Sequence, residues 1–231
     1  LFTPLLPQIP SSYLDPRHIV QAIRDIRGQR RFRFVRDAVR ALDLNRRIVE
    51  LGAGPLAYDY LIVAPGSRTE YFNVPGAREH TWDFKTLEDA VVLRERILDV
   101  CEHADHAADP QARRRMLTFV VVGGGYTGVE LITERRAFLV RCGAGRYRGV
   151  AARGLRLVIL EASPEVLRGI HPELARVAKR RLLRAGIEIH VSAQATRCFP
   201  GGVELTGREV LEAETVIWTA GVRASDIVES L

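Results

Sequence analysis

A glycine-rich hexapeptide in the second half of the chain has the spacing of a phosphate-binding loop. It follows the apolar run VVV, matches G-x-G-x-x-G and consists of Gly123, Gly124, Gly125, Tyr126, Thr127 and Gly128. In such a loop the first glycine permits a tight turn, the second lets a pyrophosphate approach the backbone, and the third lets helix and strand pack closely. Free N–H groups at the start of the next helix then face the phosphates. We predict that all six residues bind a dinucleotide; the alternative is a purely structural glycine-rich turn.

An acid ends the next predicted strand. The segment LRLVILEA contains Glu161, at the position where such units place the carboxylate that bonds the ribose hydroxyls. Glu161 lies 33 positions after Gly128, more than the usual spacing of about 20. A glycine-rich insertion at 143–154 accounts for the excess. A carboxylate repels the 2′-phosphate of NADPH, and the first arginine after it is Arg168, so the sequence predicts NADH as the ligand.

Two further side chains near the loop allow two interpretations each. Glu130 lies on the first turn of the predicted helix, two residues past Gly128. It either complements the helix dipole as a surface acid or makes a polar contact near the nicotinamide, and we predict the second role. Tyr126 is either a plain loop residue or lines the nicotinamide entrance.

The elements around these residues predict an α/β fold. Short apolar strands are expected at 117–122, 155–160, 187–191 and 215–219, with helices from the glycines to about 142 and over 172–185. A meander with glycines at 201, 202 and 207 precedes the last strand. Residues 116–222 thus read β-α-β-α-β, meander, β. This order predicts a Rossmann-like domain with a parallel sheet and right-handed crossovers.

The first half of the chain predicts a second set of elements. We expect a short helix from Asp15-Pro16 to about Ile26, and a hairpin of 32–42 with 46–51. The run YDYLIV at 58–63 is typical of a buried parallel strand. A loop at 67–80, a helix over 87–103 and a polar linker over 104–115 complete the set.

Parts of the two halves follow a repeated pattern. In each, a β-rich stretch leads to an apolar strand ending in Ala-x-Gly or Ala-Gly, and the interval from Val35 to Ala64 is 29 positions, as is that from Val191 to Ala220. Gly123 precedes Val191 by 68 positions, whereas Leu1 precedes Val35 by only 34. The simplest interpretation is a two-dinucleotide flavoprotein whose first flavin-binding segment is absent.

Composition excludes several other classes of protein. The net charge of +6 comes from scattered arginines, without interleaved aromatic residues or a nucleic-acid motif, so no nucleic-acid partner is expected. The three cysteines are single, which argues against a disulfide framework, a redox dithiol and a zinc site, and the histidines show no metal-ligand spacing. No secretory leader or membrane-spanning run is evident. We therefore expect no metal and a reducing cytosol.

The chain resembles type II NADH dehydrogenase, the single-subunit NADH:quinone oxidoreductase within the two-dinucleotide flavoproteins. The resemblance covers essentially the whole chain in six segments: FTPLLPQ, YDYLIVAPGS, KTLEDAVVLRERI, LTFVVVGGGYTGVELITE, LVILEASPEVL and ETVIWTAGVRA. It implies hydride transfer from NADH to FAD, followed by electron transfer to a membrane quinone. By this resemblance the glycine loop and Glu161 hold NADH, and Glu130 lies beside the nicotinamide and flavin. The same resemblance places Ala220 and Gly221 near the nicotinamide, Ala64, Pro65 and Gly66 near the flavin, and Val39 beside the adenine of FAD.

The resemblance also implies a division of the chain. Residues 1–84 would be a partial FAD-binding domain, 85–115 a connecting helix and linker, 116–222 the NADH-binding domain, and 223–231 the return to the FAD domain. The family's FAD glycine loop and its C-terminal quinone and membrane-contact segments are expected outside the chain. The expected location is either the cytoplasm or the inner face of the cell membrane. Two alternatives stay open: a catalytically dead NADH-binding module, and a reductase of the ferredoxin or monodehydroascorbate type.

Overall fold

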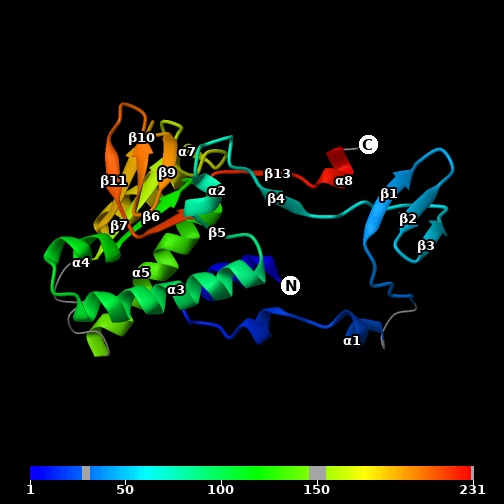
Figure 1. Ribbon diagram of the computed structural model, residues 1–231, viewed down its shortest axis with the longest axis horizontal. Coiled ribbons are helices and arrows are strands. Elements are labelled where there is room, and N and C mark those ends of the chain that lie inside the picture. Colours follow the sequence, from blue (N-terminus) through cyan, green and yellow to red (C-terminus); the bar gives the residue numbers. More distant parts are fainter. Residues whose placement is uncertain (28–31, 146–154, 230–231) are drawn as a thin grey trace. The chain divides into compact units, whose positions relative to one another are not determined.

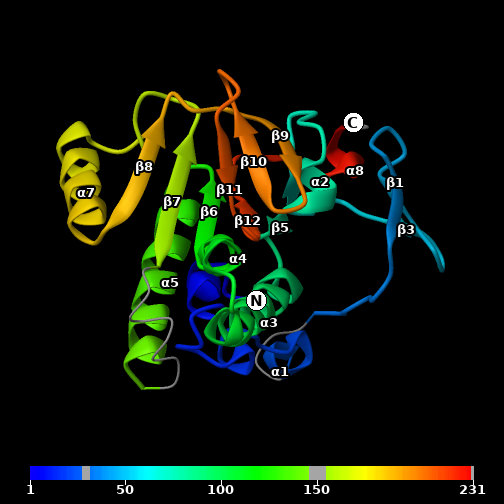
Figure 2. The ribbon, with the colours of Figure 1, turned by 60° about the vertical axis from the view of Figure 1, so that its left-hand side comes forward.

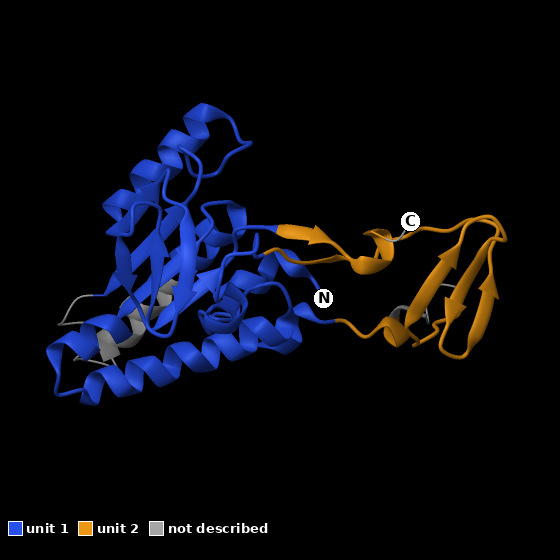
Figure 3. Cartoon of the chain, turned by 45° about the horizontal axis from the view of Figure 1, so that its top comes forward, with its two compact units in different colours: residues 1–20, 71–221 blue, residues 21–70, 222–231 orange. Residues whose placement is uncertain are grey.

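The computed structural model describes residues 1–27, 32–145 and 155–229. These residues form two units, which Figure 3 colours separately. Unit 1 consists of residues 1–20 and 71–221, and unit 2 consists of residues 21–70 and 222–231. Each unit has its own sheets, so the two are described one after the other.

A five-stranded sheet forms the centre of unit 1. Its strands, in spatial order, are β5 (Trp82–Asp83), β12 (Thr215–Trp218), β6 (Thr118–Val122), β7 (Arg156–Glu161) and β8 (Ile187–Val191). Every neighbouring pair is parallel. All residues of β6 and β12 are buried, as expected for parallel strands covered on both faces. The four strands predicted at 117–122, 155–160, 187–191 and 215–219 are therefore confirmed; β5 was not predicted.

Helices cover one face of this sheet and a small antiparallel sheet covers the other (Figure 1). Successive side chains of β6 point to opposite faces. Phe119 and Val121 pack in the cluster formed with α3 and α5, whereas Val120 and Val122 pack against the antiparallel sheet. That sheet contains β9 (Ala195–Phe199), β10 (Gly202–Leu205) and β11 (Val210–Glu212), in the order β11-β10-β9. The predicted meander is confirmed.

The helices of unit 1 that the structure describes differ in how they begin, and only some of them have a capping side chain. They are η1 (Thr3–Gln8), η2 (Pro16–Ile19), α2 (Ala77–His80), α3 (Leu87–His106), α4 (Pro110–Met116), α5 (Tyr126–Gly145) and α7 (Pro172–Arg184). Thr86 and Asp89 form a reciprocal capping box at the start of α3: the Thr86 hydroxyl accepts from the Asp89 N–H at 3.1 Å, and the Asp89 carboxylate accepts from the Thr86 N–H at 2.7 Å. Gly186, just after α7, has φ +75°, which a glycine adopts without strain. These ends match the prediction.

Unit 2 is built from short antiparallel pairs. It contains α1 (Ile23–Arg27), β1 (Val39–Asp43), β2 (Ile48–Leu51), β3 (Gly54–Ala57), β4 (Ser67–Thr69), β13 (Val222–Ala224) and α8 (Asp226–Glu229). β1, β2 and β3 form one sheet and β4 pairs with β13 in another. The predicted hairpin is confirmed at β1 and β2, with Asp43 opposite Ile48 beside the turn, and β3 extends it. Residues 32–38 of the expected first strand do not lie in a strand.

The predicted strand at 58–63 is wrong. No residue from 58 to 63 lies in a strand, and Tyr60 and Ile62 are 96% and 91% exposed. A strand requires a neighbour for its backbone N–H and C=O groups. The Tyr58 N–H donates to the Arg47 carbonyl at 3.1 Å, but the segment joins none of the sheets that the described residues of unit 2 form.

Three other expectations need correction. The predicted helix over 16–26 is divided, because Val20 is extended between η2 and α1. The expected linker over 104–115 contains α4, whose N-cap Asp109 accepts from two backbone N–H groups. The expected loop over 67–80 contains β4 and α2. The cap at Asp109 accounts for α4, and pairing with the distant β13 accounts for β4.

The two compact units do not follow the division that the resemblance implies, and that division into domains stays a prediction. Residues 1–20 and 71–84, expected in the flavin half, belong to unit 1 together with 85–115. The reason is packing: Leu6 and Ile9 lie in the cluster of the five-stranded sheet. Within the glycine-rich insertion expected at 143–154, residues 143–145 end α5, and residues 146–154 lie outside the described residues.

Candidate functional site

The glycine loop lies where β6 ends and α5 begins, at the carboxyl edge of the parallel sheet. Gly123 has φ +111°, a left-handed conformation that favours glycine. Its N–H donates to the Leu160 carbonyl at 2.8 Å, and its own carbonyl accepts from the Thr219 hydroxyl at 3.1 Å. A Cβ atom on Gly123 would lie 2.7 Å from the Ala220 backbone. The turn therefore depends on a glycine and is held by the ends of β7 and β12.

The other two motif glycines have different surroundings. A Cβ atom on Gly128 would lie 2.0 Å from the Gly123 carbonyl oxygen, so helix and loop approach too closely for any side chain. A Cβ atom on Gly125 would meet nothing within 4 Å. Open space above Gly125, at the start of α5, is what a pyrophosphate needs to approach the backbone. Tyr126 and Thr127 are exposed beside this space.

Glu161 ends β7 and its carboxylate lies against the glycine loop. One carboxylate oxygen accepts from the Gly124 N–H at 2.8 Å. The other accepts from the N–H and the hydroxyl of Ser163, at 2.8 and 2.6 Å. The predicted acid and the predicted loop are therefore brought together, with the negative charge fixed beside the loop.

A cavity of about 240 Å³ opens next to this carboxylate. It is lined by Phe72, Val74, Val122, Gly123, Leu160, Glu161, Ala162, Ala193, Gln194, Ala195, Trp218 and Ala220. Most of these residues follow the carboxyl ends of β6, β7, β8 and β12, where ligands of parallel sheets bind. The sequence analysis missed residues 193–195, which that rule could have found, and Phe72 and Val74, for which no local signal exists.

Glu130 lines a different cavity. That cavity, of about 280 Å³, lies between η1 and α5 and is lined by Pro4, Pro7, Gln8, Val129, Glu130, Thr133 and Glu134. Glu130 is exposed within it. The structure therefore places Glu130 on the helix that carries the glycine loop but outside the Glu161 cavity, and its role near the nicotinamide stays a prediction.

Unit 2 brings two of the residues expected near FAD to one cavity. Val39 and Pro65 line a space of about 640 Å³ together with Arg40, Ser67, Arg68, Ser225, Asp226 and Ile227. The Ser225 hydroxyl is buried without a hydrogen-bond partner among the described residues. Ala64 and Gly66 are exposed beside the cavity, and Gly66 has φ +77°. Contact of these residues with FAD stays a prediction, and the described residues of unit 2 contain no glycine loop between a strand and a helix.

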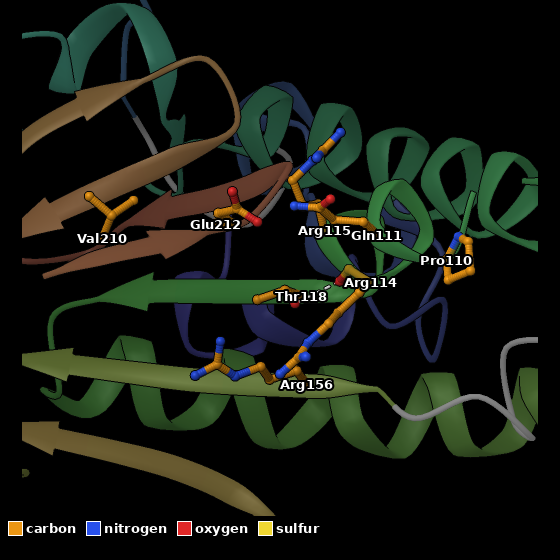
Figure 4. A pocket seen from close by; sticks show the side chains of 8 residues that line it. All are labelled: Pro110, Gln111, Arg114, Arg115, Thr118, Arg156, Val210 and Glu212. Carbon is orange, nitrogen blue, oxygen red and sulfur yellow. Dashed lines mark hydrogen bonds between the residues drawn. The ribbon is translucent and has the colours of Figure 1, made fainter.

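A further cavity lies at the opposite, amino edge of the sheet (Figure 4). It measures about 540 Å³ and is lined by Pro110, Gln111, Arg114, Arg115, Thr118, Arg156, Val210 and Glu212. Thr118 and Arg156 begin β6 and β7. Arg156 donates twice to Glu188, at 2.9 and 2.8 Å, which offsets its charge. Without a glycine loop, and away from the carboxyl edge, this cavity does not fit a dinucleotide.

The thiols give no sign of redox chemistry. Cys101 and Cys198 are buried, and neither forms a disulfide with another described residue. Burial raises the pKa of the Cys198 thiol to about 11, so the reactive thiolate is scarce at neutral pH. The side chain of Cys142 lies outside the described residues. Among the residues that the structure describes, no group of three His, Cys, Asp or Glu side chains could hold a metal, and no helix is long and apolar enough to cross a bilayer.

Known proteins are similar to this chain in sequence and in fold. The chain is 34% identical to the type II NADH:quinone oxidoreductase NdhA of Mycobacterium tuberculosis, covering 98% of this chain and 50% of that protein. It is 27% identical to the mitochondrial external alternative NAD(P)H-ubiquinone oxidoreductase B4 of Arabidopsis thaliana, covering 99% of this chain and 42% of the relative. The chain thus spans about half the length of the curated relatives it matches.

A solved structure and a family model also match the chain. The structure of NDH2 from Plasmodium falciparum in complex with NADH matches with a TM-score of 0.88 at 21% identity, covering all of this chain and 50% of that one. The family model of pyridine nucleotide-disulphide oxidoreductases matches residues 2–230. The chain belongs to the pyridine nucleotide-disulphide oxidoreductase family.

Proposed function

We propose that unit 1 binds NADH and that the chain is the NADH-binding part, with some of the flavin-binding part, of an FAD-dependent NADH:quinone oxidoreductase. The observation that carries the proposal is the juxtaposition of the Glu161 carboxylate with the Gly124 N–H at 2.8 Å, beside the open space above Gly125. That arrangement would place a phosphate cradle beside a ribose acceptor. The names of the curated relatives support the choice of NADH and quinone.

The residues of the glycine loop would position the nucleotide. N–H groups at the start of α5 would face the pyrophosphate above Gly125, while Glu161 would accept from the ribose hydroxyls and repel a 2′-phosphate. The backbone at Ala220 and Gly221, which follows β12, would lie on the nicotinamide side. Glu130 would make a polar contact close to the nicotinamide and flavin.

The flavin half of the proposal rests on unit 2. Val39 and the turn at 64–66 would contact FAD, and Ser225, whose buried hydroxyl has no partner among the described residues, could bond a polar group of it. When bound, FAD supplies the hydride acceptor and passes electrons onward, so no acid–base residue of the chain is required. We extend the proposal to a quinone as acceptor and to peripheral contact with the cytoplasmic face of a membrane.

Titration of the purified chain with NADH and NADPH tests the proposal. We expect NADH to bind at least about tenfold more tightly, and Glu161→Gln to reduce that preference by about tenfold. Glutamine keeps an oxygen for the Gly124 N–H but removes the charge that repels the 2′-phosphate. The visible flavin band, recorded with added FAD and then NADH, reports whether the chain turns over. Saturable binding in the parent and equal affinity for both nucleotides would contradict the role of Glu161.

A second candidate function is a nucleotide-binding module without turnover. The observation that favours it is the exposure of Ala64 and Gly66, which were expected to lie near the flavin. NADH binding without any bound flavin would select this candidate. Flavin bleached by NADH would exclude it.

A further inference from the structure

Phe72 is an exposed aromatic residue in a conformation that is costly for its type. Its side chain is 57% exposed, and it lines the same cavity as Glu161 and Ala220. Its φ is +51°, and Asn73 follows with φ +55°. Two successive non-glycine residues in the left-handed region are uncommon, and for a bulky side chain the conformation persists only when its surroundings impose it.

The residues on either side of Phe72 impose its left-handed conformation. On its amino side, the Tyr71 hydroxyl donates to Asp83 at 2.6 Å, and the Tyr71 ring lies 5.8 Å from the Trp218 ring, measured between centroids. On its carboxyl side, the Pro75 carbonyl accepts from the Cys198 N–H at 2.9 Å.

The backbone at Gly76, the next residue, also lies close to β9. A Cβ atom on Gly76 would lie only 2.1 Å from the Cys198 carbonyl oxygen, so the chain packs directly on β9. Between these two anchors, the Val74 N–H donates to the Tyr71 carbonyl at 2.9 Å and closes a tight turn. Segment 71–76 is therefore fixed at both ends, and the turn presents the Phe72 ring at the cavity.

The cavity extends from Gly123 and Ala220 to Glu161 and residues 193–195, and its Glu161 side suits the adenosine end of a dinucleotide. Besides Glu161, which marks the ribose position in such units, it contains Ala162 and residues 193–195 from the loop after β8. Its other walls are mainly aliphatic, including Val74 and Leu160. A volume of about 240 Å³ is smaller than the roughly 300–1,000 Å³ of pockets that enclose a whole ligand, so it fits one part of a dinucleotide.

We propose that Phe72 is a positioning residue whose ring stacks on the adenine of the bound dinucleotide, and that segment 71–76 is strained in order to hold the ring there. The proposal rests on the proposed NADH site and names a residue outside the glycine loop that contributes to it. Stacking on a rigidly held ring loses little conformational entropy and accepts the flat face of a base.

Binding of ADP-ribose tests the proposal, because this probe carries the adenine and lacks the nicotinamide. We expect Phe72→Ala to weaken ADP-ribose and NADH by the same factor, about tenfold, and Phe72→Trp to restore binding. Reduced nicotinamide mononucleotide, which lacks adenine, should bind Phe72→Ala as it binds the parent. Leu174→Ala on α7 is the matched control, since Leu174 is 62% exposed and does not line the cavity.

Phe72→Gly separates a positioning role from a structural one. Glycine adopts φ +51° without strain, so this variant should unfold at the same temperature as the parent or higher while ADP-ribose binding falls. A lower unfolding temperature with unchanged ADP-ribose binding would overturn the proposal, as would Phe72→Ala weakening NADH but not ADP-ribose. If the parent bound neither NADH nor ADP-ribose, the proposed function itself would fail.

Discussion

The two copies of the repeated pattern fold differently. In both, three antiparallel strands form a small sheet: β9 to β11 in unit 1 and β1 to β3 in unit 2. In unit 1 the chain then enters β12, which is wholly buried between β5 and β6. In unit 2 the corresponding apolar run, 58–63, is not a strand, and Ile62 is 91% exposed. The same local pattern therefore gave a central strand in one unit and an exposed segment in the other.

The difference teaches what an apolar run specifies. An apolar run indicates that a segment is stable only when both of its faces are buried. The hydrogen bonds and the burial of a parallel strand come from neighbouring segments. β12 finds β6 on one side and β5 on the other. The described residues of unit 2 offer the run at 58–63 no such neighbour. Experiments on both units can test this contrast.

The largest expected effect concerns the glycine loop of unit 1. Gly128→Ala forces a methyl group to within 2.0 Å of the Gly123 carbonyl oxygen, so we expect loss of NADH binding and destabilisation of about 1–3 kcal/mol or more. Gly125→Ala is the matched variant, because its methyl group meets no protein atom within 4 Å. It should lose NADH binding and keep the parent's unfolding temperature. Equal unfolding temperatures for the two variants would contradict this account.

Limited proteolysis should show different protease sensitivity in the two units. Chymotrypsin should cleave first after Tyr60, which is 96% exposed outside any strand, while the bonds after Phe119 and Trp218 in the buried sheet stay protected. Mass spectrometry of the early fragments gives the order of cleavage. Early cleavage within β6 or β12 would show that unit 1 opens as readily as unit 2.

A smaller effect is expected at the start of α3. Thr86→Ala removes the hydroxyl that accepts from the Asp89 N–H, and should lower the free energy of unfolding by about 1 kcal/mol. Thr86→Ser keeps the hydroxyl and should unfold at nearly the parent's denaturant midpoint. Urea unfolding followed by circular dichroism measures both. A loss of the same size in Thr86→Ser would assign the effect to the lost methyl group instead of the cap.

The smallest effect concerns the ion pair between β7 and β8. The side-chain hydrogen bond from Arg156 lowers the pKa of Glu188, outweighing desolvation, and His190 adds to the lowering. A lowered folded-state pKa stabilises the protein above the unfolded-state pKa, and this contribution is lost as pH falls through the folded-state value. Because Glu188 is 44% exposed, Glu188→Gln should cost less than about 1 kcal/mol at neutral pH.

Urea unfolding of Glu188→Gln and the parent across the acid range measures this contribution. The two proteins should converge as the carboxylate is protonated. The exposed Arg68–Asp226 pair of unit 2, whose two side chains are each 57% exposed, serves for comparison, and Asp226→Asn should change stability less than Glu188→Gln does. A pH-independent difference for Glu188→Gln would attribute the loss to packing.

Most of the candidate site could be predicted from the sequence, because each of its residues meets a steric or positional requirement set by its near neighbours in the chain. Gly123 needs a positive φ, Gly128 needs the absence of a side chain, and Glu161 follows directly from the end of a strand. The parallel strands of unit 1 were found for a similar reason: short apolar runs alternate with helices whose starts carry caps, such as Thr86. The pairing with Glu161 also followed from the known geometry of such units.

Other features depended on contacts between distant segments. Leu6 and Ile9 join the core of unit 1 although more than sixty positions separate them from its sheet, and no pattern near residue 1 indicates this. β5, only two residues long, exists because β12 lies beside it. Phe72 reaches the Glu161 cavity because Tyr71 and Pro75 are anchored to residues that lie at 83, 198 and 218.

By itself, the sequence determined the glycine loop, the acid that faces it and the succession of strands and helices along residues 116–222, since each follows from backbone sterics, capping and hydrophobic periodicity over a few residues. The tertiary structure alone decided which apolar runs became strands, where the unit boundaries fell and which residues complete the cavity. The physical reason is that hydrogen-bond partners and burial come from segments far apart in the chain. A local pattern indicates that a segment requires such partners but does not identify them.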